Sequence, residues 1–239
     1  MMRIEVLPDG AAVAHAAAAL IAREARAAVT SRGRFVLALS GGRTPWPMLR
    51  ALAGENVPWP AVQIFQVDER LAPAGDPDRN LTRLQENLLS LAPIAASQIH
   101  PMPVEAGDLA DAVLRYASVL RAVAGSPPTL DLIHLGLGAD GHTASLVPDD
   151  PVLDVSDADV GLAGPYQGHP RMTLTYPILN RARQLLWVVS GPEKAQMLLR
   201  LCHGDATIPA GRVTQTNARV LADRAAARMI EATGGPHAP

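Results

Sequence analysis

The sequence contains little cysteine and few aromatic side chains. Its 239 residues include one cysteine, Cys202, so no disulfide can form within the chain. Cys202 lies in the apolar run MLLRLCH, which indicates that it fills space in the interior. Aromatic residues make up only 3% of the chain, but hydrophobic residues make up 48%. This composition predicts a packed globular core rather than disorder.

The chain also lacks an excess of charge of either sign. It has 21 Lys and Arg residues against 23 Asp and Glu residues, which gives no electrostatic reason to expect nucleic acid or an anionic membrane as partner. Arg3, Glu5 and Asp9 suit neither a secretory signal nor a transit peptide. The alanine-rich stretch that follows is interrupted by charged residues and is too polar to span a bilayer. We expect a cytoplasmic protein that is a monomer or a weak dimer.

Apolar runs alternate with predicted helices along the chain. Strands are predicted at residues 35–40, 62–67, 130–137, 171–176, 184–191 and 218–223. Helices are predicted at residues 10–31 (capped by Asp9 and ended by Gly33), 45–52 (capped by Thr44), 81–91 (capped by Asn80), 108–124, 192–201 and after 223. This alternation predicts an α/β fold with a mainly parallel sheet and helices on both faces. We expect one domain over residues 1–233 and a disordered tail over 234–239.

Three polar clusters follow predicted strands, at residues 40–44, 68–70 and 136–142. In parallel α/β sheets, ligands bind beyond the carboxyl ends of the strands. We therefore expect the three clusters to converge on one site.

The third cluster contains the pattern G-x-G-x-x-G at residues 136–141. A dinucleotide site would need a helix that begins within the glycines, and an acidic residue at the end of the next strand. Here His142 and the proline-containing segment TASLVPDDP follow, which disfavours a dinucleotide. The glycines can instead project Asp140 and His142 into a pocket, where the histidine takes a proton from water and the carboxylate fixes its tautomer. A role for His142 in helix capping alone remains an alternative.

The first cluster, SGGRTP, links a buried strand to a predicted helix. Two glycines expose backbone N–H groups, the helix N-terminus attracts negative charge, and Ser40 and Thr44 supply hydroxyl donors. This combination fits a phosphate monoester, although an ordinary turn is the alternative. The segment ALSGG also resembles a nucleophile elbow, which would need a histidine beside Ser40.

The second cluster is Asp68-Glu69-Arg70. Arg70 forms either a surface salt bridge or a forked contact to a phosphate or a developing oxyanion.

Together these residues resemble the 6-phosphogluconolactonase family. The matching pieces are Ser40-Gly-Gly-Arg-Thr-Pro45, Asp68-Glu-Arg70, Gly136-Leu-Gly-Ala-Asp-Gly-His-Thr-Ala-Ser-Leu146, PRMTLT (170–175) and SGPEKAQ (190–196). They occur in order over residues 35–200. The resemblance implies a Rossmann-like fold and hydrolysis of 6-phosphoglucono-δ-lactone in the pentose phosphate pathway, without metal or organic cofactor.

The resemblance also implies roles for individual residues. His142 would be the base, Asp140 would orient it, and Arg70 would stabilise the oxyanion. The residues implied in binding the substrate and its phosphate are Ser40, Gly41, Gly42, Arg43, Thr44, Asp68, Arg171 and Lys194.

Two positions depart from the family pattern. Val147 replaces a phenylalanine that often follows Ser-Leu, and Arg79 replaces a serine before Asn80 and offers an additional cation. In the related glucosamine-6-phosphate deaminases a glutamate matches Val147 and a tyrosine matches Arg70. The sequence therefore favours a lactonase over a deaminase or isomerase. A sugar-phosphate-binding protein without catalysis is the alternative of a different class.

Overall fold

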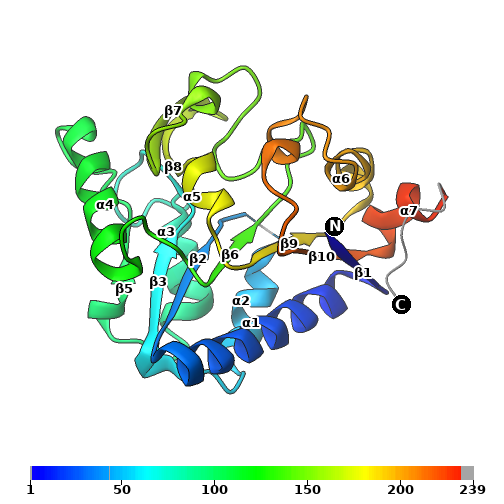
Figure 1. Cartoon of the computed structure of the whole chain (residues 1–239), viewed down its shortest axis with the longest axis horizontal. Coiled ribbons are helices and arrows are strands. Elements are labelled where there is room, and N and C mark those ends of the chain that lie inside the picture. The colour runs from blue at the N-terminus through cyan, green and yellow to red at the C-terminus, as the bar shows by residue number, and fades with distance from the viewer. Residues whose placement is uncertain (1, 43, 233–239) are drawn as a thin grey trace.

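Seven parallel strands form the central sheet of the computed structural model, which describes residues 2–42 and 44–232 (Figure 1). In order across the sheet they are β1 (Arg3–Leu7), β10 (Ala218–Asp223), β9 (Leu185–Val189), β6 (Leu132–Leu135), β2 (Phe35–Leu39), β3 (Val62–Gln66) and β5 (Ile99–His100). All residues of β2, β6 and β9 are buried, because helices cover the sheet on both faces. The predicted parallel α/β sheet is confirmed, whereas the edge strands β1 and β5 were not predicted.

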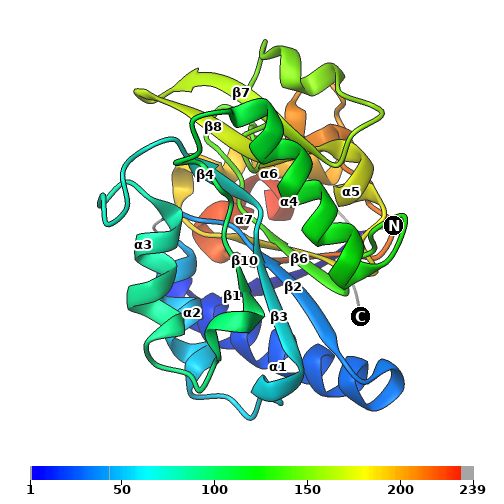
Figure 2. The same ribbon diagram turned by 90° about the vertical axis from the view of Figure 1, so that its left-hand side faces the viewer.

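Helices pack on both faces of this sheet (Figure 2). One face carries α1 (Gly10–Arg32), α2 (Pro45–Ala53) and α3 (Asn80–Leu84), and the other carries α4 (Leu109–Ala124), α5 (Tyr176–Asn180), α6 (Ala195–Cys202) and α7 (Arg224–Ala232). None of the helices in the described part of the chain is long and apolar enough to cross a membrane. The predicted tail at 234–239 lies outside the described residues.

Helix α1 begins and ends as the sequence predicts. The Asp9 carboxylate accepts the Ala12 N–H at 2.8 Å, and Gly33, with φ of 74°, donates its N–H to the Val29 carbonyl. Thr44 is the N-cap residue of α2 and Pro45 its first residue, as predicted, although the Thr44 side chain makes no capping hydrogen bond. The predicted cap at Asn80 is wrong, because Asn80 is the first residue of α3 and Arg79 precedes it as the cap residue.

A second, three-stranded antiparallel sheet lies over the face that carries α4 (Figures 1 and 2). Its order is β4 (Asp68–Arg70), β8 (His169–Leu174) and β7 (Val160–Tyr166). The strand predicted at 171–176 therefore exists as β8, but it pairs with β4 and β7 instead of joining the parallel sheet. This small sheet was not predicted, and it carries part of the site.

The direction of chain winding reverses between β2 and β6. From β2 the chain proceeds outward to β3 and β5, whereas from β6 it proceeds through β9 to β10 on the other side. At such a reversal the connections that leave two adjacent strands diverge, which opens a crevice at their carboxyl ends. The segments that begin at Ser40 and at Gly136 leave β2 and β6 at this point.

Candidate active site

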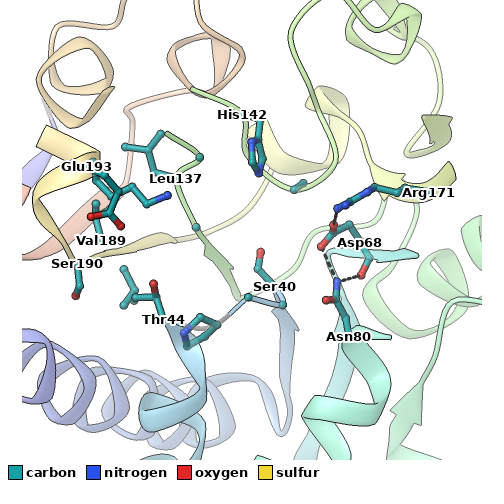
Figure 3. A pocket seen from close by; sticks show the side chains of 18 of the residues that line it. Ser40, Thr44, Asp68, Asn80, Leu137, His142, Arg171, Val189, Ser190 and Glu193 are labelled. Carbon is teal, nitrogen blue, oxygen red and sulfur yellow. Dashed lines mark hydrogen bonds and ion pairs between the residues drawn. The ribbon is translucent and has the colours of Figure 1, made fainter. Parts of the chain in front are cut away.

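A pocket of about 350 Å³ occupies this crevice (Figure 3). Residues from all three predicted clusters line it, together with two of the predicted cations: Ser40, Gly41, Gly42, Thr44, Asp68, Arg70, Gly136, Gly138, His142, Arg171 and Lys194. The His142 ring projects over the hollow on the side opposite Ser40 (Figure 3). The clusters therefore converge as the sequence predicts. Arg43 lies outside the described residues.

Asp140 holds the imidazole of His142 from behind. Asp140 Oδ1 lies 2.6 Å from His142 Nδ1 and also accepts the His142 backbone N–H at 3.2 Å. A carboxylate partner at Nδ1 favours the tautomer protonated there, which leaves Nε2 as the proton acceptor. Burial alone raises the pKa of Asp140, but hydrogen bonds from His142 and Tyr166 outweigh it and hold that pKa well below its ordinary value.

The glycine-rich turn makes room for this pair. A Cβ at Gly138 would lie 2.1 Å from His142 Nδ1 and 2.4 Å from Asp140 Oδ1, so a larger residue would displace both side chains. The Gly138 N–H also closes the turn by donating to the His142 carbonyl at 2.8 Å. The glycine at position 138 therefore serves the Asp140–His142 pair.

Ser40 anchors the first cluster (residues 40–44, which form the first loop of the site) to β6. Its backbone N–H donates to His134 Nδ1 at 3.3 Å, and its hydroxyl donates to the His134 carbonyl at 3.0 Å. Burial lowers the pKa of His134 to about 4, so this ring is neutral near pH 7. The hydroxyl proton of Ser40 thus goes to a carbonyl oxygen, which is not a general base. This geometry does not favour the nucleophile-elbow alternative.

Asn80, predicted only as a cap, lies between the first loop and the second cluster, Asp68–Arg70. Its Oδ1 accepts a hydrogen bond from Arg70 Nη1 at 2.6 Å. Its Nδ2 donates to the Asp68 carbonyl at 2.9 Å and to Asp68 Oδ1 at 3.2 Å (Figure 3). A Cβ at Gly41 would lie 1.8 Å from Asn80 Oδ1. Position 41 must therefore be glycine for Asn80 to hold Arg70. Apart from the position of Asn80 at a helix start, no sequence pattern predicts this contact.

The buried carboxylate of Asp68 connects the second cluster to β8 and to the segment that follows the third cluster. Asp68 Oδ2 accepts the Ser145 hydroxyl at 2.7 Å and lies 3.9 Å from Arg171 Nη1. Arg70 and Arg171 are directly paired across β4 and β8, so two cationic residues start from neighbouring positions on the small sheet. Burial lowers the pKa of Arg171; the Asp68 charge opposes that effect and the Arg70 charge adds to it. A bound anion would relieve this excess of buried positive charge.

Glu69 and Arg79 are buried and hold the second cluster in place. Glu69 is fully buried and accepts the backbone N–H groups of Arg70, Asn80 and Leu81. Arg79 is also buried, with its Nε 3.1 Å from Glu69 Oε2. The prediction that Arg79 offers the site an additional cation is wrong, because its charge faces Glu69 rather than the pocket.

Lys194 is the only lysine among the 21 Lys and Arg residues of the chain. It lies just before α6 and lines the pocket, next to Glu193 in the chain. Within the described ranges, no group of three or more His, Cys, Asp or Glu side chains is arranged to hold a metal ion.

The chain is similar to proteins of one known family, both in sequence and in fold. The profile of the family described as glucosamine-6-phosphate isomerases/6-phosphogluconolactonase matches residues 8–222. A 6-phosphogluconolactonase of Synechocystis is 38% identical over 175 residues, covering 72% of each chain. One of Mycobacterium tuberculosis is 36% identical over 241 residues, covering 95% of this chain and 98% of the relative. The crystal structure of a 6-phosphogluconolactonase from Thermotoga maritima matches with a TM-score of 0.84 and 28% identity, covering 93% of this chain and 99% of that one.

The ionisation of Asp140 gives a test of the pair. Because its pKa is lower in the folded state than in the unfolded chain, its hydrogen bonds stabilise the fold above about pH 4, and this stability is lost as the pH falls further. We expect urea unfolding between about pH 3 and pH 7 to show wild type losing free energy of unfolding relative to Asp140→Asn only at the acid end. A difference between the two proteins that does not change with pH would contradict this account of the pair.

Proposed function

This chain belongs to the glucosamine-6-phosphate isomerase/6-phosphogluconolactonase family, and we propose that His142 activates the water that opens its lactone. The activity of the chain is hydrolysis of 6-phosphogluconolactone, the reaction for which its relatives are named. The observation that carries the proposed mechanism is the 2.6 Å contact of His142 Nδ1 with Asp140, which leaves Nε2 to accept a proton.

The phosphate of the substrate binds at the first loop. Gly41, Gly42 and Thr44 line the pocket directly before α2, where backbone N–H groups and the helix dipole attract an anion. The Thr44 hydroxyl makes no capping bond, which favours its use by the ligand. Lys194 supplies charge from the other side of the pocket, and Arg171 reaches it from β8. Arg43 belongs to the same proposed loop.

Hydrolysis then proceeds in two proton transfers. His142 Nε2 removes a proton from water as the water oxygen bonds to the lactone carbonyl carbon. Arg70, held in place by Asn80, stabilises the oxyanion that develops on the carbonyl oxygen. As the oxyanion collapses, the bond from that carbon to the ring oxygen breaks, and His142 returns its proton to the ring oxygen. Asp140 stays ionised throughout and stabilises the protonated imidazole.

The geometry favours this lactone chemistry over a deaminase reaction. Val147, at the position where the resemblance places the deaminase glutamate, is a buried apolar side chain. The nearby Asp150 uses both carboxylate oxygens on backbone N–H groups, those of Val152 and Gly164. Among the described residues Asp140 is the carboxylate in contact with His142, which suffices for base catalysis of an ester.

Replacing the base tests the mechanism directly. We expect His142→Asn to lower kcat by about 10²- to 10⁴-fold, because general base catalysis contributes that much, and to leave KM nearly unchanged. The measurement is a stopped-flow assay of freshly prepared lactone. His15→Asn, on the exposed side of α1, is the matched control and should retain wild-type kcat. If His142→Asn retained turnover within a few-fold, His142 would not be the base.

The space at Gly138 offers a second test. In Gly138→Ala the new methyl group must displace Asp140 or His142, and a misplacement of about 1 Å costs on the order of 10²-fold in rate. We expect a loss of kcat of that size in the same assay. Gly107→Ala, where a Cβ meets nothing within 4 Å and which lies outside the pocket lining, is the control. Equal activity of the two variants would refute the role assigned to Gly138.

The single lysine tests the phosphate assignment. Lys194→Ala should raise KM for the phosphorylated lactone by about 10- to 100-fold, the value of one charge-assisted hydrogen bond, with little change in kcat. With the phosphate-free lactone of the same sugar acid, wild type and Lys194→Ala should have the same kcat/KM. A comparable loss with both substrates would assign Lys194 to the reacting end of the lactone.

A further inference from the structure

A tyrosine hydroxyl completes the surroundings of the Asp140–His142 pair. Tyr166 donates its hydroxyl to Asp140 Oδ2 at 3.0 Å, the oxygen that does not bind the imidazole, and the same hydroxyl lies 3.4 Å from His142 Nδ1. The Tyr166 and His142 rings meet edge to face, with centroids 5.1 Å apart. Both oxygens of Asp140 and one side of the imidazole ring are thus fixed by partners.

Tyr166 arrives at this place on the β7–β8 hairpin. The two turn residues of this hairpin, Gln167 and Gly168, have φ of 51° and 90°, which matches the type I′ turn of a tight two-residue loop. The register shifts between Ala163 and Tyr166, so β7 carries a bulge directly before the tyrosine. A bulge re-aims the side chains that follow it. Asp150 pins the bulge by accepting the Gly164 N–H at 2.8 Å.

Arg171 fixes Tyr166 from β8. Its Nη2 donates to the Tyr166 carbonyl at 3.0 Å, and its guanidinium carbon lies 5.1 Å from the centre of the Tyr166 ring. Burial and the Asp140 charge raise the pKa of Tyr166, whereas the Arg171 charge opposes the rise, so the hydroxyl stays protonated and donates. The charged groups that act on the Tyr166 hydroxyl are Asp140 and Arg171, and Arg171 in turn lies near Asp68, Arg70 and Glu69.

We propose that Tyr166 is a positioning residue of the lactonase reaction: its hydroxyl locks the Asp140 carboxylate, and its ring limits rotation of His142, so that Nε2 faces the substrate. This role rests on the proposed function of His142. Without the hydroxyl, Asp140 can rotate about its side-chain bonds, and the imidazole samples orientations in which Nε2 cannot reach the attacking water. Because Tyr166 acts through Asp140, it affects the chemical step rather than substrate binding.

The test removes only the hydroxyl. We expect Tyr166→Phe to lower kcat about 10- to 100-fold, the value of a hydrogen bond to a charged group, with KM within about two-fold of wild type. Tyr176→Phe is the matched control: it deletes a hydroxyl bonded to the Pro209 carbonyl at 2.9 Å, outside the pocket lining, and should keep wild-type kcat. In an Asp140→Ala background, Tyr166→Phe should change kcat by less than about two-fold, because its acceptor is gone.

The outcomes separate this role from the proposed function. If Tyr166→Phe keeps wild-type kcat while His142→Asn has lost it, the positioning role is wrong and the proposed base stands. If Tyr166→Phe is as damaging in the Asp140→Ala background as in wild type, the tyrosine does not act through Asp140, and the role is again wrong. If His142→Asn retains turnover, the proposed mechanism itself fails, and the role of Tyr166 fails with it.

Discussion

The buried carboxylate of Asp68 joins the parts of the chain that form the pocket. It binds the Ser145 hydroxyl at 2.7 Å and the Asn80 amide, and it neutralises part of the charge of Arg171. These partners come from three separate segments, none of which is held in place by the parallel sheet alone. A buried carboxylate is stable only if its oxygens are occupied, so each partner also depends on the others. The shape of the pocket therefore follows from satisfying one desolvated charge.

The two sheets contribute different parts of the site. The parallel sheet opens a crevice where β2 and β6 diverge, and it supplies the glycine-rich turns that approach a ligand closely. The antiparallel sheet covers one side of that crevice and contributes the long side chains, Arg70, Arg171 and Tyr166. Loops on a parallel sheet alone would leave Asp140 and His142 with fewer contacts. The hairpin brings Tyr166 into contact with both residues of the pair.

The sequence predicted the strands, helix ends and site residues that depend on local patterns and motifs. The runs that became β2 and β9 are continuously apolar because both faces of these strands are covered, and the capping pattern of α1 is complete. The antiparallel sheet escaped prediction because β4 is three residues long and β7 contains glycine and proline. Arg79 was misjudged because the direction in which an arginine points depends on tertiary structure. Tyr166 was missed because its contact with Asp140, 26 residues earlier in the chain, depends on how the β7–β8 hairpin packs against the glycine-rich turn.

The contact of Gly41 with Asn80 links two positions that are far apart in the chain. The volume that a methyl group at residue 41 would need is already filled by the Asn80 amide, which in turn holds Arg70 and Asp68. A change at either position therefore leaves a collision or a void unless the other changes with it. Residues 41 and 80 are therefore sterically coupled, and a transplant of the first loop into another scaffold has to carry the residue that faces position 41 along with it.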